Sequence, residues 1–201
     1  MKIVCLDMEG VLTPEIWINV AKSTGIDELN LTTRDISDYD VLMKRRLEIL
    51  KENNITLKDI QEVINQMDPL PGAKEFLDWL RTQTQVLILS DTFLELGGMF
   101  MKKLNYPTLL CHNLIIDEMG MISDYKIRIS DQKRKTTQAL MKMNYEVIAA
   151  GDSYNDTAML KEATNGILFR PPQNVIDEFP EFPVVTKYED FKQTISDLLK
   201  I

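Results

Sequence analysis

The chain opens with a short apolar stretch that ends in two acidic residues. Residues 2–6 read KIVCL, a run of the kind that is typical of a buried strand. Asp7 and Glu9 follow at once. A carboxylate at the edge of an apolar core is costly unless a cation, a hydrogen-bond donor or water meets it. The fold must therefore bring compensating groups to the end of this strand.

Two later apolar runs also end in polar residues. QVLILSD places Ser90 at the end of one run, and EVIAAGDSYND places Asp152 and Asp156 at the end of another. A basic patch between them contains Lys133 and Lys135. Taken alone, each group suits a turn, a helix cap or a solvated helix face. Those separate explanations do not account for the convergence of all these groups on one edge of the expected sheet.

The order of the elements predicts an α/β fold. Outside residues 15–70, expected strands alternate with expected helices, which favours a Rossmann-like, mostly parallel sheet with helices on both faces. In such sheets ligands bind beyond the carboxyl ends of the strands. Strands are expected at 2–6, 86–90, 108–111, 147–150, 166–169 and 184–185, and a β-hairpin at 113–129. Helices are expected at 73–81, 92–104, 154–163 and 188–199, with one more from a cap at Ser130 through Met143.

Residues 15–70 predict a helical insertion without strands of its own. Apolar periodicity after Glu15 ends at Gly25, residues 38–52 continue as helix, and Thr56 opens a third helix with a capping box. Pro69 to Gly72 then breaks the pattern. The expected division is an α/β core of residues 1–14 and 71–201 and a small helical cap of residues 15–70.

Composition excludes several classes of protein. The 201 residues are 44% apolar and carry a net charge of −8, which argues against general binding to nucleic acid or to an anionic membrane. Two cysteines make neither a disulfide framework nor a zinc motif. No apolar run approaches a membrane span and no signal peptide is visible, so a cytoplasmic location is expected.

The polar groups suit phosphoryl transfer through a covalent intermediate. The Asp7 carboxylate could attack phosphorus, and Glu9 could exchange protons with the leaving or attacking oxygen. Asp152 could hold Mg²⁺ together with Asp7, while Ser90 and a lysine stabilise the transferring group. GDSYND lacks the glycine and the glutamate of a calcium-binding EF-hand loop, and the chain has no P-loop.

These strings resemble the haloacid dehalogenase superfamily, and within it the phosphoserine phosphatase branch. CLDMEGVLT, ILSDT, the lysines of DQKRK and AAGDSYND occur in that family's order, and the resemblance spans essentially the whole chain. It implies a Mg²⁺-dependent phosphatase with an aspartyl-phosphate intermediate and a place in serine and threonine biosynthesis. The helical insertion matches the small cap of that branch.

The resemblance also implies a role for each matching residue. Asp7 is the expected nucleophile, Glu9 the general acid/base and Ser90 a phosphoryl ligand. Lys133 matches the family lysine better than Lys135 does. Magnesium would be held by Asp7, Asp152 and the backbone carbonyl of Glu9, with Asp156 in its outer shell. Asn155 would contact the substrate or its phosphate. Glu15 and Arg46 would bind the ammonium and the carboxylate of phosphoserine.

Two positions depart from the family pattern. The second acid is usually Asp and is Glu9 here, and the residue after Ser90 is usually Gly and is Asp91 here. DMEGVLTPEIW, LSDTF, TTRDISDYDVLMKRRLEIL and PTLLCHNL are similar to a bacterial subgroup that couples phosphoserine hydrolysis to phosphoryl transfer onto homoserine. This similarity makes homoserine the expected second substrate.

Two other functions stay open at this point. One is a phosphatase of the same family that acts on another small phosphomonoester. The other is a phospho-aspartate receiver module, which also uses Asp, Ser or Thr, Lys and Mg²⁺. The receiver is the weaker alternative, because GDSYND follows the lysine and a long helical insertion accompanies the site.

Overall fold

One sheet organises the core of the molecule. The computed structural model describes residues 1–32, 35–36 and 38–201, so Thr33, Arg34 and Ser37 of the TTRDIS string lie outside the described residues. The strands are β1 (Lys2–Leu6), β2 (Gln85–Phe93), β3 (Thr108–Ile116), β4 (Ile122–Lys126), β5 (Glu146–Gly151), β6 (Asn165–Phe169) and β7 (Val184–Val185). Within the described residues these seven form one sheet in the order β4-β3-β2-β1-β5-β6-β7.

Strand β1 lies in the middle of this sheet. It pairs in parallel with β2, where Cys5 lies opposite Leu87, and with β5, where Cys5 lies opposite Ala149. Pairing is parallel throughout except between β3 and β4, which form the expected antiparallel hairpin. The predicted α/β fold with a mostly parallel sheet and one hairpin is therefore confirmed.

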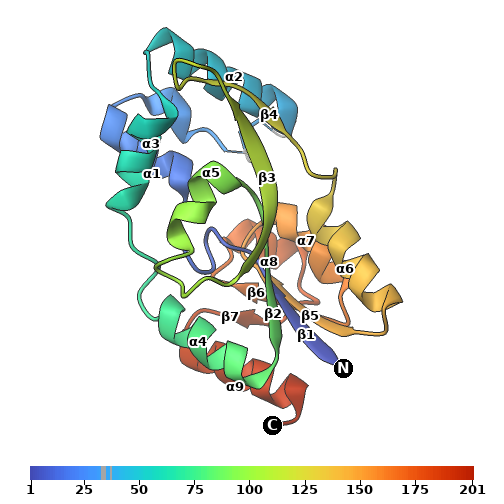
Figure 1. Cartoon of the computed structure of the whole chain (residues 1–201). Coiled ribbons are helices and arrows are strands. Elements are labelled where there is room, and N and C mark those ends of the chain that lie inside the picture. Colours follow the sequence, from blue (N-terminus) through green and yellow to red (C-terminus); the bar gives the residue numbers. More distant parts are fainter. Residues whose placement is uncertain (33–34, 37) are drawn as a thin grey trace.

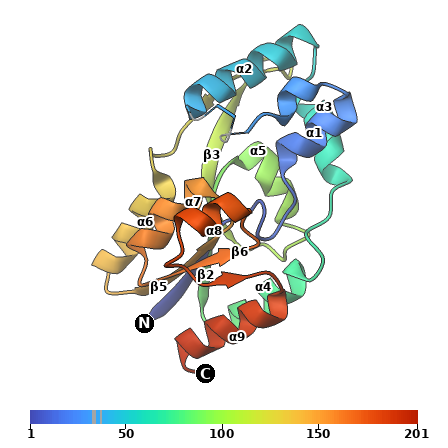
Figure 2. The same cartoon turned by 180° about the vertical axis from the view of Figure 1, so that it is seen from behind.

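Helices follow most of the strands. Their bounds are α1 (Ile16–Thr24), α2 (Tyr39–Glu52), α3 (Leu57–Asn65), α4 (Ala73–Gln83), α5 (Leu94–Gly97), α6 (Gln132–Lys142), α7 (Tyr154–Glu162), α8 (Gln173–Glu178) and α9 (Tyr188–Leu199), with 3₁₀ turns η1 (Asp27–Asn30) and η2 (Gly98–Phe100). Figures 1 and 2 show α4 and α9 side by side on one face of the sheet and α6 and α7 on the other. Across the described part of the chain, no helix combines the length and apolarity that crossing a bilayer requires.

The alternation of side chains along β1 divides the core in two. Val4 and Leu6 belong to a cluster that includes Phe76 of α4 and Phe191 of α9 and continues into the helices after β1. Ile3 and Cys5 point the other way, into a cluster with α6 and α7. Both faces of β1 are thus buried, which explains why the strand is apolar at consecutive positions.

Helices α1, α2 and α3 form the cap that follows β1. Gly25 ends α1 in a left-handed conformation with φ +72°, and Thr56 and Asp59 make the predicted capping box at α3. The hairpin also reaches the cap, as Figure 1 shows. The Tyr125 hydroxyl of β4 donates a hydrogen bond to Asp40, and the Leu57 N–H donates to the Gly120 carbonyl at 2.9 Å.

Several element boundaries differ from the prediction. Residues 92–104 do not form one helix, because β2 continues to Phe93 and only the short α5 and η2 follow. Gly97 packs so closely that a Cβ there would lie 2.6 Å from Thr92 Cγ2, so the site favours glycine over a better helix former. Ser130 does not cap α6, since Asp131 precedes its first residue with φ +54°. Helix α8, which follows Pro172, was not predicted.

We expect the Phe191→Ala variant to lose stability because it opens a hole in the aromatic stack between α4, α9 and β6. The Phe191 ring stacks on Phe76 at 4.6 Å and on Phe169 at 4.8 Å between centroids, and it is fully buried. The free energy of unfolding, measured by urea denaturation, should fall by about 3–5 kcal/mol. The exposed Met119→Ala variant is the control and should change it by less than about 0.5 kcal/mol. Similar small losses in both variants would contradict the packing described here.

Candidate active site

The polar residues predicted from the strand ends meet at the carboxyl edge of the sheet. Asp7 follows β1, Asp152 follows β5, and Ser90 lies in the last part of β2 beyond its paired residues with β1. Lys133 comes from the first turn of α6. All four side chains line a single cavity of about 340 Å³ under the cap. The structure therefore brings these predicted site residues together.

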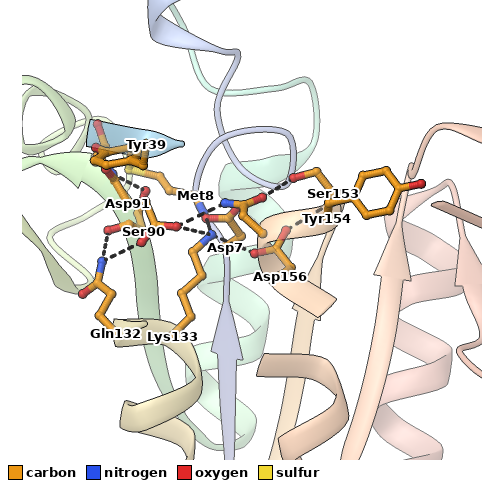
Figure 3. A network of polar contacts seen from close by, with 12 residues as sticks. Asp7, Met8, Tyr39, Ser90, Asp91, Gln132, Lys133, Ser153, Tyr154 and Asp156 are labelled. Atoms are coloured by element: carbon orange, nitrogen blue, oxygen red, sulfur yellow. Dashed lines mark hydrogen bonds and ion pairs between the residues drawn. The ribbon is translucent and has the colours of Figure 1, made fainter. Parts of the chain in front are cut away.

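Lys133 lies at the centre of the site. Its Nζ is 2.9 Å from Asp7 Oδ1, 2.7 Å from Asp156 Oδ1 and 3.7 Å from Asp91 Oδ2 (Figure 3). Only 3% of the residue is exposed. Burial opposes a charged ammonium, but the carboxylates of Asp156, Asp7 and Asp91 outweigh it and raise the pKa of Lys133 well above its ordinary value. Lys135, in contrast, bonds Ser130 at the surface, so Lys133 is the lysine in the site.

Asp156 organises the turn that carries Asp152. Its Oδ2 accepts hydrogen bonds from the backbone N–H of Asp152 at 3.0 Å and of Ser153 at 3.2 Å. A Cβ at Gly151 would lie 2.2 Å from Asp156 Cγ, so the close approach needs glycine there. Because Lys133 already holds Oδ1, both oxygens of Asp156 have protein partners.

Three buried carboxylates could hold a metal ion. Oxygens of Asp7, Asp152 and Asp156 lie within 4.8 Å of one another. Burial, then the nearby charge of Asp156, raises the pKa of Asp7 well above its ordinary value despite Lys133. Three acids against one lysine leave an excess of negative charge in a buried place, which a divalent cation with a preference for oxygen ligands would offset. The donor set therefore fits such an ion.

A tight loop carries Glu9 from β1 towards α1. Glu9 Oε2 accepts a hydrogen bond of 2.8 Å from the Ile16 N–H at the start of α1. Burial raises the pKa of Glu9 to about 8, and the carboxylate of Glu15 adds to this. Gly10 has φ +77°, and a Cβ there would lie 2.4 Å from Asp152 Cγ. The close approach of this loop to Asp152 thus places Glu9 and Asp152 in the lining of the same cavity.

The cap contributes Arg46 and Glu15 to the cavity. Arg46 is 7% exposed, donates from Nη2 to the Leu31 carbonyl at 2.7 Å, and lies with Cζ 4.6 Å from the centre of the Trp17 ring. Its buried Nε has no hydrogen-bond partner in the described part of the chain. Burial lowers the pKa of Arg46 to about 10. An unpartnered buried donor beside a cavity suits an anionic ligand.

The structure adds residues that the sequence did not single out as members of the site. Tyr39 of α2 donates from its hydroxyl to the Asp91 carbonyl at 2.9 Å. Asn155, which was expected in the site, donates from Nδ2 to Asp91 Oδ2 at 3.2 Å. Gln132 bonds the Ser90 carbonyl. Burial acts against the charge of Asp91, but Lys133 and hydrogen bonds outweigh it and hold its pKa below the ordinary range. Of Tyr39, Gln132 and Asp91, the sequence drew attention only to Asp91, which stands where the family usually has glycine.

A larger cavity of about 1100 Å³ adjoins the smaller one. It shares Tyr39, Asp91, Ser153 and Asn155 with the smaller cavity. Asp7, Glu9, Lys133 and Arg46 line only the smaller one. These four residues, which the sequence predicted for the site, therefore belong to the 340 Å³ cavity.

Comparisons with known proteins agree with this geometry. Phosphoserine phosphatase ThrH of Pseudomonas aeruginosa is 59% identical over 193 residues, which cover 96% of this chain and 94% of that protein. A phosphoserine phosphatase of Pseudomonas syringae pv. tomato is 56% identical and covers 96% and 81%.

Solved structures share the fold at lower identity. A phosphoserine phosphatase in apo form has a TM-score of 0.77 at 19% identity and covers 99% of this chain and 98% of that one. A substrate-bound phosphoserine phosphatase complex has a TM-score of 0.75 at 18% identity, with 93% of each chain covered. The family model described as haloacid dehalogenase-like hydrolase matches residues 1–164. The chain therefore belongs to the haloacid dehalogenase-like hydrolases.

Proposed function

We propose that this protein is a Mg²⁺-dependent phosphoserine phosphatase that also transfers the phosphoryl group to homoserine. The observation that carries the proposal is the Asp7–Lys133–Asp156 cluster, because its Asp7 and Lys133 line the same cavity as Glu15 and Arg46. A nucleophilic carboxylate and groups for a zwitterionic amino acid thus share one space. The relatives at 59% and 56% identity are named phosphoserine phosphatases and extend over nearly all of this chain.

Asp7 is the proposed nucleophile. Its Oδ1 already interacts with the Met8 N–H at 2.7 Å and with Lys133, which leaves Oδ2 as the attacking oxygen. Oδ2 forms a bond to phosphorus while the bond from phosphorus to the serine oxygen breaks. Lys133 holds the carboxylate in place, and Ser90 and Asn155 are the proposed donors to the phosphoryl oxygens.

Glu9 is the proposed general acid and base. Its raised pKa keeps a proton available near neutral pH, and that proton passes to the departing serine oxygen. In the second half-reaction the Glu9 carboxylate takes the proton of water or of the homoserine hydroxyl. That oxygen forms the new bond to phosphorus, and the bond to Asp7 breaks.

The proposed magnesium ligands are Asp7, Asp152 and the backbone carbonyl of Glu9, with Asp156 in the outer shell. Both oxygens of Asp156 already have protein partners, which supports its place outside the inner shell. A bound Mg²⁺ would neutralise part of the negative charge that the carboxylates and the phosphoryl group bring together.

The amino acid part of the substrate is assigned to the cap. Arg46 offers an unpartnered Nε–H for the carboxylate, and Glu15 offers a carboxylate for the ammonium group. Homoserine has the same two charged groups and one more methylene than serine. The same pair can therefore hold it with its hydroxyl towards Asp7.

We assign residues 1–14 and 71–201 to the catalytic core and residues 15–70 to the cap. The Leu70 N–H donates to the Leu12 carbonyl at 2.9 Å, so the two ends of the insertion lie together, as a separate unit requires. The bond from Tyr39 to Asp91 then joins the cap to the core directly at the site.

Product analysis tests the function. With Mg²⁺ and phosphoserine alone, we expect free phosphate over many turnovers. Added homoserine should divert part of the phosphoryl group to phosphohomoserine, and EDTA should stop both reactions until Mg²⁺ is restored. Absence of phosphohomoserine would remove the transferase activity alone. If phosphoserine is not among the fastest substrates in a panel of phosphorylated metabolites, the amino acid assignment fails.

The Asp7→Asn variant tests the nucleophile. We expect phosphate release to fall by more than about 10³-fold, because an amide oxygen is a poor nucleophile. Circular dichroism should show an intact fold, while the melting temperature should fall, because the variant removes one charge from the buried Lys133 cluster. The exposed Asp190→Asn variant on α9 makes the same chemical change far from the site and should keep full activity. Multiple-turnover activity in Asp7→Asn would disprove this assignment.

The Arg46→Ala variant tests recognition of the amino acid. We expect KM for phosphoserine to rise roughly 10- to 100-fold, the value of a lost charge-assisted hydrogen bond. KM for p-nitrophenyl phosphate should rise far less, because that substrate has no carboxylate. Arg45→Ala is the matched control, since Arg45 is half-buried at the surface of the same helix and pairs with Glu28 outside the cavity. Equal effects of Arg46→Ala on both substrates would rule out the carboxylate contact.

A further inference from the structure

The catalytic cavity carries an unfavourable charge for the substrate proposed above. Five acidic residues line it, Asp7, Glu9, Glu15, Asp91 and Asp152, against the three basic residues Arg46, Lys133 and Arg170. The whole chain has a net charge of −8. Near neutral pH the phosphate group of a phosphomonoester such as phosphoserine is a dianion, so the substrate brings further negative charge to the cavity. Mg²⁺ on Asp7 and Asp152 would offset charge inside the cavity, and a positive side chain where the ligand enters would act on the ligand before it reaches that ion.

Two of the three basic residues are already compensated or covered. Lys133 is 3% exposed, and its charge is met by Asp7, Asp156 and Asp91. Arg46 is 7% exposed and lies under the cap against Trp17. Arg170, directly after β6, is the exposed one. Among the described residues that line this cavity, it is the cation that solvent and an incoming anion reach first.

Arg170 is held firmly in this place. Its Nε donates to the Thr186 carbonyl at 2.8 Å, and its Cζ lies 4.7 Å from the Phe169 ring centre and 4.9 Å from that of Tyr188. The Tyr188 hydroxyl donates to the Val11 carbonyl at 2.7 Å, two residues after Glu9. The guanidinium thus lies on two rings, of which Tyr188 also bonds the loop after β1, and this fixes a charge beside the site.

The remaining donors of Arg170 point to a ligand. Its Nη groups make no hydrogen bond or ion pair within the part of the chain that the structure describes. The backbone at Arg170 is left-handed, with φ +52°, a conformation that glycine adopts more easily. The chain nevertheless has an arginine there, and its four Nη–H donors suit the oxygens of a phosphate.

We propose that Arg170 is a further substrate-binding residue, which attracts dianionic phosphomonoesters to the catalytic cavity through their net charge. This inference rests on the proposed function. The proposed contact of Arg46 distinguishes substrates that have an amino acid carboxylate from those that lack one. Arg170, in contrast, would act on any ligand of the same net charge. A fixed charge at the mouth of an acidic cleft raises the local concentration of an oppositely charged ligand.

The test compares kcat/KM of Arg170→Gln with that of the wild type at low and high ionic strength. At about 30 mM salt we expect a loss of roughly three- to tenfold, and at about 0.5 M salt less than about twofold, because salt screens a surface charge. The loss should be equal for phosphoserine and p-nitrophenyl phosphate, with kcat unchanged. Arg170→Lys, which keeps the charge, should restore most of the activity.

Arg81→Gln is the control for net charge. Arg81 is exposed in the last turn of α4, ahead of the amino end of β2, and donates to the Asn105 carbonyl. This variant changes the charge of the chain by the same amount and should leave kcat/KM at the wild-type value. An equal loss in Arg81→Gln would assign the effect to net charge and overturn the proposal.

Two further results would overturn it. A loss in Arg170→Gln that is the same at both salt concentrations, or that appears in kcat, would mean that Arg170 only supports the loop or β7. An unchanged kcat/KM at low salt would remove the role entirely. The wild-type protein in the same experiment separates the two proposals, since failure to hydrolyse phosphoserine there would refute the proposed function itself.

Discussion

The buried ammonium of Lys133 is the interaction on which the site depends. It lies between Asp7, which follows β1, and Asp156, which belongs to α7, at 2.9 and 2.7 Å. Without these acids, burial would favour a neutral lysine, and without the lysine the two acids would repel each other. Removing one member of such a buried cluster costs about 3–5 kcal/mol, because the remaining charge stays unpaired. The same contact that positions Asp7 therefore also joins two layers of the fold.

This cluster forms only because the backbone comes unusually close to the carboxylates. A Cβ at Gly10 would lie 2.4 Å from Asp152 Cγ, and one at Gly151 would lie 2.2 Å from Asp156 Cγ. A side chain at either glycine would push the acid away. The glycines in DMEG and AAGDS thus leave room for the neighbouring acids, to which the proposed function assigns the chemistry.

Local pattern and parallel topology account for what could be predicted from the sequence. The apolar runs before Asp7 and Asp152 are strands, and parallel strands bring their carboxyl ends to one edge, so these acids were expected to converge. Glu15 and Arg46 were found through the family resemblance, because no local pattern links a residue in α2 to β1. Tyr39 and Arg170 escaped prediction, since their roles depend on contacts with Asp91 and Thr186, which are distant in the sequence. The prediction of one helix at 92–104 was wrong for a similar reason, because close packing of Gly97 against Thr92 is a tertiary contact that the local sequence pattern does not show.

The three cations of the cavity show why one residue cannot serve every purpose. A cation that orders carboxylates, as Lys133 does, has its field largely cancelled by them and attracts little from outside. A cation that recognises a carboxylate at close range, as proposed for Arg46, must be buried, because a water-filled contact would weaken its hydrogen bonds. Attraction at a distance requires the opposite, a charge that is exposed and uncompensated. Among the three basic residues that line this cavity, Arg170 on its aromatic support is the one in that position.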